Sequence, residues 1–404
     1  MVRSGGSVKP VDVYAGFAAF GGFWGAWGAS IPAVRDQAGV GTGRLGTALL
    51  AIAVGALPAM LLSGRLVDRW PSRATAAVLV GMGLAGVGVA VAGHDLISLS
   101  IGLAVLGATS GAADVGLNSL AGGAQQVHGR PVISRAHACF SAAVVVGSLG
   151  AGVLLGSGMP LAVVFLLVAA GTTGAAVRLA VVAGPTGGGT GSTAPAPGTS
   201  RAARSALVGL ATPLAVVGGL GTLAYAVENA HQSWSALYLR DVLSAGPVTA
   251  AAGPAVFAAI AAVTRGGTGD LGARRPRPVV VAGATIAAIG TGTLALAPNW
   301  AVGLVGIALA AAGTAALFPT LLGALNHHLP PDVRGTATSI VTTTAYLGFL
   351  AGPGYVGHWA DAVGLPGAML AVAVVAQALA LLAAAALPMV TSRPPDHGSP
   401  STEG

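Results

Sequence analysis

Residues 64–73 read Gly-Arg-Leu-Val-Asp-Arg-Trp-Pro-Ser-Arg, and residues 266–275 read Gly-Gly-Thr-Gly-Asp-Leu-Gly-Ala-Arg-Arg. Each stretch places a glycine four residues before an aspartate and arginines just beyond it, between long apolar segments. Only 8% of the residues in the chain are charged. Two such clusters at matching places therefore indicate that the chain consists of two related halves. Membrane proteins with internal repeats are commonly transporters that hold a substrate between the repeats.

The composition predicts a membrane protein. Of the 404 residues, 54% are hydrophobic, and the mean hydropathy is +0.80. A soluble domain carries roughly 25% charged residues, which is far more than this chain has. Apolar stretches recur at a length of about 20 residues, enough to cross a bilayer as helices. The stretches are continuously apolar and do not alternate at period two, so we expect helices and not strands.

We expect an all-α membrane protein with about twelve transmembrane helices in two pseudo-symmetric six-helix bundles. Residues 1–182 form the predicted N-terminal bundle, and residues 206–391 form the C-terminal bundle. Between them, residues 183–205 are rich in Gly, Ser, Pro and Thr and read as a flexible cytoplasmic linker. Residues 392–404 read as a disordered tail. The predicted spans are 13–33, 43–63, 74–93, 96–118, 137–157, 160–181, 206–238, 247–264, 279–297, 301–325, 337–358 and 366–388.

The distribution of basic residues orients this arrangement. With both termini in the cytoplasm, Arg35, Arg44 and Arg240 lie outside, and the other 16 of the 19 Lys and Arg residues lie inside. This asymmetry follows the positive-inside rule and predicts a multi-pass protein of the bacterial cytoplasmic membrane, with the lipid bilayer as its surroundings. It also accounts for the basic isoelectric point of about 10.5, so no nucleic-acid partner is expected. The first apolar stretch is longer than the core of a signal peptide and reads as an uncleaved span.

The sequence contains no pattern typical of an enzyme or a cofactor site. Cys139 is the single cysteine, so no intramolecular disulfide forms, and it reads as an inert residue of a helix. We find no His, Cys, Asp or Glu spacing typical of a metal site and no glycine-rich phosphate loop after a strand. We therefore expect no catalytic residues, no metal and no cofactor.

The repeat extends beyond the two charged signatures. Ser30 is followed after four residues by Arg35-Asp36, and Ser235 is followed after four residues by Arg240-Asp241. Both dipeptides fall at the outer end of the first span in their half. A further match pairs Arg135 and Ser141, at the start of span five, with Arg334 and Ser339, at the start of span eleven. These matches support an internal duplication.

Twelve spans, a central linker and a Gly-x-x-x-Asp-x-x-x-x-Arg signature after span two resemble the major facilitator superfamily over essentially the whole chain. Three stretches resemble a bacterial YbjJ-type branch related to the fucose permeases: residues 114–118, 129–141 and 228–243. That branch often has an acidic residue directly before the tryptophan of span seven. This chain has Ser233 there, so a coupling role at that position is not carried over.

The resemblance implies that the two signatures form a gate at the cytoplasmic ends of the helices. The gating candidates are Asp68, Arg69, Arg73, Asp270, Arg274 and Arg275. An aspartate that approaches the N-terminus of a neighbouring helix interacts favourably with the helix dipole, which would hold the inner side closed. The alternative is that these charges serve topology and solubility alone.

Two carboxylates fall inside predicted spans, Asp114 and Glu228. An acid within a membrane is costly and normally faces the bundle interior or a water-filled path. Asp114, Glu228 and His231 are therefore the candidates for proton coupling, with His231 able to relay protons near neutral pH. The alternatives are a structural hydrogen bond between Asp114 and Asn118, and a structural role for His231.

Five residues are candidates for the substrate cavity: Trp24, Asn118, Tyr225, Trp234 and Tyr346. Trp24 belongs to a stripe of Phe17, Phe20, Trp24 and Trp27 at helical spacing in the first span. Aromatic rings over a cavity can stack on sugar faces or apolar solutes. More often, such a stripe packs against neighbouring helices.

The expected function is secondary active transport of a small solute, with sugar-like solutes among the candidates, by alternating access and coupled to protons. The runner-up is a drug/proton antiporter. Such antiporters usually carry Gly-Pro late in span five, but residues 147–156 contain no proline, and Gly352-Pro353 occurs in span eleven. A membrane sensor or scaffold without transport is the alternative of another class. We expect a monomer, and the sequence leaves the substrate and the direction of transport open.

Overall fold

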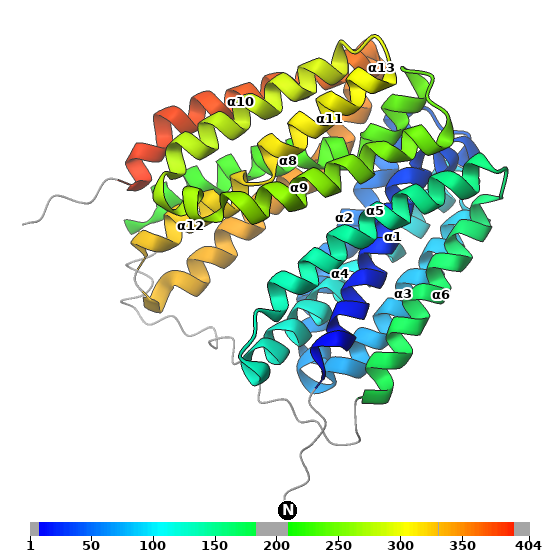
Figure 1. Cartoon of the computed structure of the whole chain (residues 1–404), viewed down its shortest axis with the longest axis horizontal. Helices are drawn as coiled ribbons and strands as arrows, with labels where there is room; N and C mark the ends of the chain where they lie inside the picture. Colours follow the sequence, from blue (N-terminus) through cyan, green and yellow to red (C-terminus); the bar gives the residue numbers. More distant parts are fainter. Residues whose placement is uncertain (1–7, 183–208, 330, 392–404) are drawn as a thin grey trace, which may run out of the picture.

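Figure 1 shows the computed structural model, which describes residues 8–182, 209–329 and 331–391. The first half consists of α1 (Pro10–Ala38), α2 (Thr42–Arg69), α3 (Pro71–Ala92), α4 (Leu96–His128), α5 (Val132–Gly156) and α6 (Leu161–Val182). The second half consists of α8 (Ala211–Asp241), α9 (Pro247–Arg274), α10 (Pro276–Ala295), α11 (Trp300–Thr314), α12 (Leu317–His328) and α13 (Pro331–Thr391). The predicted linker and tail lie outside the described residues.

The structure confirms the all-α fold and its two bundles, which Figure 1 shows as separate groups of helices. Within the described residues, ten helices are long and apolar enough to cross a membrane. That number counts α13 once, although its backbone leaves helical geometry at Gly364, where φ is 76°. Only glycine adopts such a φ without strain, and the bend separates the predicted spans 337–358 and 366–388. Helices α11 and α12 together form the predicted span 301–325, and α1 completes the set of twelve.

Local sequence signals start and end several of these helices. Proline occupies the first turn of α1, α3, α9 and α10, where its missing N–H costs no hydrogen bond. Asp95 caps α4 by accepting hydrogen bonds from the backbone N–H groups of Ile97 and Ser98. These hydrogen bonds, chiefly that from the Ser98 backbone, lower the pKa of the Asp95 carboxyl below its usual value.

Inside each bundle, the first helix packs closely on the fifth. In the first half, a Cβ on Gly21 or Gly25 of α1 would collide with the backbone of α5 at Phe140 and Val144. In the second half, a Cβ on Gly348 of α13 would collide with the backbone of α8 at Thr222. Small residues permit such close approach in membrane bundles. The equivalent helices of the two repeats thus meet in the same way, which supports the predicted duplication.

The two bundles meet mainly at one end of the molecule. Figure 1 shows that they converge where α1 ends and α2 begins, and diverge where α2 ends and α3 begins. Helix α5 contacts α9, where Ser148 Oγ donates a 2.7 Å hydrogen bond to the Ala251 carbonyl. Helix α2 contacts α13 at Gly46 and Gly357. We call the converging end, which carries the two Arg-Asp dipeptides, the latch end. The opposite end, which carries Asp68 and Asp270, is the signature end.

Candidate functional site

A cavity of about 380 Å³ lies between the bundles near the middle of the long helices. Its walls come from α1, α2, α4 and α5 of the first bundle and from α8, α9 and α13 of the second. Aromatic and apolar side chains form most of the lining, with a few polar groups among them. The polar and charged lining residues are Ser110, Asp114, Ser141, Tyr225, Glu228, Asn229, Gln232, Ser233, Arg265 and Tyr346. Such a mixture is typical of a site for a small organic molecule.

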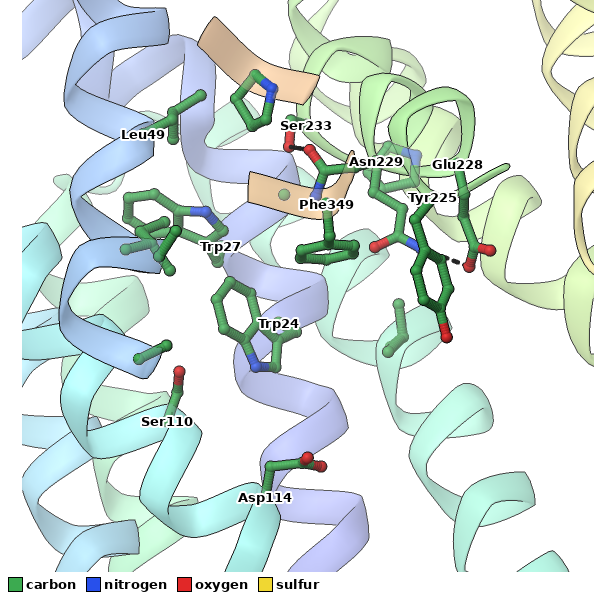
Figure 2. Close-up of a pocket in the computed structure, with 18 of the residues that line it drawn as sticks. Trp24, Trp27, Leu49, Ser110, Asp114, Tyr225, Glu228, Asn229, Ser233 and Phe349 are labelled. Atoms are coloured by element: carbon green, nitrogen blue, oxygen red, sulfur yellow. Dashed lines mark hydrogen bonds between the residues drawn. The ribbon is translucent and has the colours of Figure 1, made fainter. Parts of the chain in front are cut away.

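Helix α8 contributes one regular face to the cavity. Tyr225, Glu228, Asn229, Gln232 and Ser233 all line it, at the spacing of three, four, seven and eight residues that one helix face requires. Figure 2 shows four of these side chains, Tyr225, Glu228, Asn229 and Ser233, between the helices that surround the cavity. The glutamate predicted from the sequence therefore reaches the cavity together with four neighbours on the same helix.

Two candidates on α8 point elsewhere. His231 is buried, shares a 2.9 Å hydrogen bond with Thr291 Oγ1 of α10 and stacks on Phe257 at 5.8 Å between ring centroids. Trp234 is 0% exposed. Neither residue lines the cavity, because both fall off the helix face that Glu228 and Gln232 share. The structure thus places them in the packing between helices.

The aromatic stripe of α1 divides between the cavity and the packing. Phe20, Trp24 and Trp27 line the cavity, and Figure 2 shows both tryptophans facing it. Phe17 is 1% exposed and meets His137 edge to face at 5.1 Å. Across the cavity, Tyr225 contacts Tyr346 with ring centroids 5.6 Å apart. Trp24, Tyr225 and Tyr346 therefore lie where a solute could contact them, and their role in binding remains a prediction.

Asp114 is the acidic group that the first bundle presents to the cavity. Its Oδ1 accepts a 3.0 Å hydrogen bond from Asn118 Nδ2, one turn along α4. Asn118 itself does not line the cavity. The asparagine is thus placed to orient the carboxylate and not to contact a solute directly. No ion pair to Asp114 forms among the described residues.

Glu228 forms an ion pair inside the second bundle. Arg265 Nη2 donates to Glu228 Oε1 at 2.7 Å, and Gln232 Nε2 donates to the same oxygen at 3.0 Å. The predicted eighth span ended at residue 264, and Arg265 was placed among the cytoplasmic arginines. In the structure α9 continues to Arg274, and Arg265 lies in the cavity wall, a position that the sequence did not predict. An acid inside a membrane needs a partner, and this requirement was the signal that could have identified Arg265.

The two Arg-Asp dipeptides meet at the latch end in a reciprocal arrangement. Arg35 of α1 pairs with Asp241 of α8, while Arg240 of α8 pairs with Asp36 of α1 at 2.6 Å. Each arginine also contacts the aspartate beside it, at 3.1 Å for Arg35 and 2.8 Å for Arg240. We call these four residues the latch. The sequence predicted the repeat of this pattern but not the contact between its two copies.

A second contact joins the bundles near the latch. Asp361 of α13 accepts a 2.7 Å hydrogen bond from the backbone N–H of Gly43, in the first turn of α2. The N-cap residue of α2 is Gly41, which provides no side-chain cap. Asp361 therefore caps a helix of the opposite bundle, where its negative charge is favourable at the helix N-terminus.

The gating candidates at the signature end are not brought together. Asp68, Arg69, Arg73, Asp270, Arg274 and Arg275 are all exposed, and no ion pair forms among them in the part of the chain that the structure describes. Arg69 lies over the ring of Trp70, 4.7 Å from its centroid. Their predicted gating role remains a prediction, and in this conformation the signature end is not joined by these charges.

Comparisons with known sequences agree with the superfamily resemblance. Residues 267–404 match the profile of the Major Facilitator Superfamily. An uncharacterized transporter of Sinorhizobium fredii, y4wD, is 28% identical over 256 residues, which cover 63% of this chain and 65% of that protein, a little under two thirds of its length. An uncharacterized MFS-type transporter of Yersinia pestis is 26% identical over 335 residues, which cover 82% of this chain and 83% of that protein. Neither relative indicates a branch, so the YbjJ-type resemblance remains a prediction.

Solved structures share the fold over nearly the whole chain. A bacterial homolog of the human lysosomal transporter Spinster, in an inward-facing and unoccupied conformation, is similar with a TM-score of 0.77 and 16% identity, covering 98% of this chain and 100% of that one. The nucleoside transporter NupG is similar with a TM-score of 0.71 and 13% identity, covering 95% of this chain and 99% of that one. At these identities the likeness concerns the fold, which is the major facilitator fold. Together with the sequence matches, it supports membrane transport as the class of function.

Proposed function

We propose that this protein is a secondary active transporter that moves a small solute across a membrane by alternating access, coupled to protons. The observation that carries the proposal is a cavity between two bundles that charged contacts join, within the described part of the chain, at one end only. The latch and Asp361 hold the latch end together, whereas the charged signatures at the opposite end remain unpaired among the described residues. A binding site that is closed toward one side and open toward the other is what alternating access requires.

The charge asymmetry of the sequence supplies the proposed orientation. The signature end carries most of the arginines and would face the cytoplasm of a bacterium under the positive-inside rule. Both termini would then be cytoplasmic, and the conformation would open inward. The Spinster homolog similar in fold is described as inward-facing, in agreement with this orientation.

Proton coupling is proposed for Asp114 and Glu228. The two acids line the same cavity from opposite bundles, so a conformational change would alter their surroundings together. Asp114 lacks a cationic partner within the described residues, and Glu228 has Arg265. A carboxylate without a partner in such a site is neutralised most readily by a proton. Binding and release of that proton can therefore accompany each cycle.

Two other functions remain as outcomes of the test. A drug/proton antiporter would use the same aromatic cavity, and its proton would move against the solute. A sensor or scaffold would bind without moving anything. Neither the latch nor a charged cavity between bundles is needed by a static scaffold, which favours transport.

The proposal can be tested with purified protein in vesicles that contain a pH-sensitive dye. A panel of sugars, polyols, organic acids, amino acids and lipophilic cations is screened for counterflow and for proton movement. We expect at least one solute to show counterflow and to carry protons in its own direction. Asp114→Asn should lose part or all of the proton movement while counterflow persists. Proton movement opposite to the solute would establish the antiporter, and the absence of counterflow with every solute, in a folded sample, would contradict transport.

A further inference from the structure

Arg265 is the only cationic side chain that lines the cavity within the described residues. Its Nε donates to the carbonyl oxygen of Ala315 at 3.1 Å, at the break between α11 and α12. Its Nη2 donates to Glu228 at 2.7 Å. These two bonds fix one edge of the planar guanidinium. They leave Nη1 without a partner among the described residues, and the side chain is 44% exposed.

The free edge of this guanidinium has the geometry of a carboxylate receptor. Two parallel N–H groups of an arginine match the two oxygens of a carboxylate, and this paired contact is stronger and more directional than a single hydrogen bond. Glu228 accepts the hydrogen bond from Nη2 with one oxygen, and Gln232 donates a second hydrogen bond to that same oxygen. Figure 2 shows the hydrogen bond from Gln232 to Glu228 as a dashed line beside Tyr225. The glutamate therefore accepts a hydrogen bond from Nη2 of the arginine and leaves Nη1 available to another acceptor.

We propose that the cavity selects small solutes that carry a carboxylate, and that this carboxylate binds the free edge of Arg265. The inference rests on the proposed transport function and adds the chemical class of the solute. The remainder of the solute would lie among Trp24, Tyr225 and Phe349, which line the same cavity. Aromatic rings contribute stacking and apolar contact there.

The charges of the cavity link such binding to proton uptake. The wall carries two acidic side chains, Asp114 and Glu228, and one cationic side chain, Arg265. A carboxylate ligand would add a further negative charge, which a site within a membrane accommodates poorly. A proton on one of the acids restores the balance. The charged and titratable groups around Arg265 are Glu228 and Tyr225 of α8, Asp114 of α4, Tyr346 of α13 and, within electrostatic range, His137 of α5.

A cationic solute bound to Asp114 is the main competitor, because Oδ1 of this acid has Asn118 as a partner and no cation. The two groups differ in one respect that decides between them. A carboxylate can lose its charge by taking a proton, whereas a guanidinium stays protonated in proteins. The charge of Arg265 is therefore present in every state of the cycle, and its pairing with Glu228 through Nη2 leaves Nη1 available to a second carboxylate. Asp114 requires a cation only while it is ionised.

The experiment compares matched solutes that differ in one group. Benzoate, benzamide and benzylammonium form one set, and gluconate, sorbitol and glucosamine form another. Binding to the purified full-length protein is measured by titration calorimetry. We expect binding of at least one carboxylate, at least tenfold weaker binding of its neutral counterpart, and at least a tenfold loss in Arg265→Gln. Arg277→Gln is the control, because Arg277 lies on the same bundle, exposed and away from the cavity, and it should bind as the unmodified protein does.

Two further variants keep the test decisive if Arg265→Gln does not fold. Arg265→Lys keeps the charge and loses the flat edge, so it should bind the carboxylate more weakly than the unmodified protein. The double variant Arg265→Gln with Glu228→Gln lacks both charges of the ion pair. We expect this variant not to bind the carboxylate. Binding repeated in buffers of different ionisation enthalpy should reveal proton uptake with the carboxylate, reduced in Glu228→Gln or in Asp114→Asn.

Several outcomes would overturn the inference. They are unchanged carboxylate binding in Arg265→Gln, binding of the amines alone with loss in Asp114→Asn, and no binding of any carboxylate by folded protein. Counterflow of an uncharged solute would leave the transport proposal intact while refuting the carboxylate site. Carboxylate binding without counterflow would support the carboxylate site and contradict the transport proposal.

Discussion

The two ends of the bundle interface carry similar charged patterns but use them differently. At the latch end, the repeated Arg-Asp dipeptides of α1 and α8 pair with each other across the interface. At the signature end, the charged residues of the repeated signatures, which begin in the last turns of α2 and α9, are exposed and form no ion pairs with one another within the described residues. The duplication thus provides a charged set at each end, and this conformation engages one of them. Under the proposed alternating access, we expect charge pairing at the two ends to alternate and not to occur at the same time.

Removal of both latch acids should produce the largest change in this balance. Each partly exposed ion pair contributes about 0.2–1 kcal/mol. Asp36→Asn with Asp241→Asn removes the two pairs that join the bundles, so it should weaken this conformation by roughly 0.4–2 kcal/mol, or about 2–30-fold in population. The measurement is maleimide labelling of Ser141→Cys, which lines the cavity, after Cys139→Ala removes the native cysteine. Labelling from the latch end should appear in the double variant.

A fourfold reversal provides the control for this prediction. Exchanging every latch arginine for aspartate and every latch aspartate for arginine preserves the complementarity of the pairs. It should restore protection from the latch end at least in part. If the double variant remains protected from that side, the latch does not hold this end closed.

Removal of the signature acids should have a smaller effect of opposite sign. Asp68→Asn with Asp270→Asn removes no ion pair present among the described residues, so the thermal stability of this conformation should change by less than about 0.5 kcal/mol. If these acids close the signature end in the other conformation, their loss should slow transport roughly fivefold, corresponding to about 1 kcal/mol. Labelling of Ser141→Cys from the signature end should not decrease, and a clear decrease would contradict the proposed gate.

Much of this comparison follows from the sequence because charge and hydropathy are periodic in the chain. The helices, the two bundles and the repeat depend on apolar length and on spacing, which the sequence displays directly. Glu228 and Asp114 could be assigned to the cavity because a buried acid needs a polar environment. Which face of α8 turns inward could not be assigned in the same way, so His231 and Trp234 were grouped with Glu228 although they pack elsewhere.

Contacts between residues far apart in the chain could not be predicted from the sequence. Arg265 follows an apolar stretch and precedes a charged signature, so its position alone suggested a helix end. Its ion pair with Glu228 depends on the continuation of α9 past Arg265 beside α8. The pairing of Arg35 with Asp241 likewise depends on how the two bundles meet, which the repeat by itself does not specify.

A single substitution at Asp361 separates a contact between bundles from one inside a bundle. Asp361 caps α2 from the opposite bundle, and Asp95 caps α4 within its own. Loss of a cap costs about 1 kcal/mol. Asp361→Ala should therefore both lower stability slightly and increase labelling from the latch end, whereas Asp95→Ala should only lower stability. Equal labelling in the two variants would show that the cap of α2 does not help to close this end.

The contact between Gly46 and Gly357 has a consequence for the speed of motion. A Cβ on Gly46 would lie 2.8 Å from the Pro353 oxygen and 3.0 Å from the Gly357 Cα, so α2 and α13 touch through their backbones. Helices that meet through interlocking side chains must lift those chains out of their holes before one helix can turn over the other. Here glycines form the point of closest approach, so no side chains interlock there and the two helices can turn over each other more easily. We expect the latch to determine how long the molecule stays in one conformation, and this glycine contact to keep the barrier to leaving that conformation low.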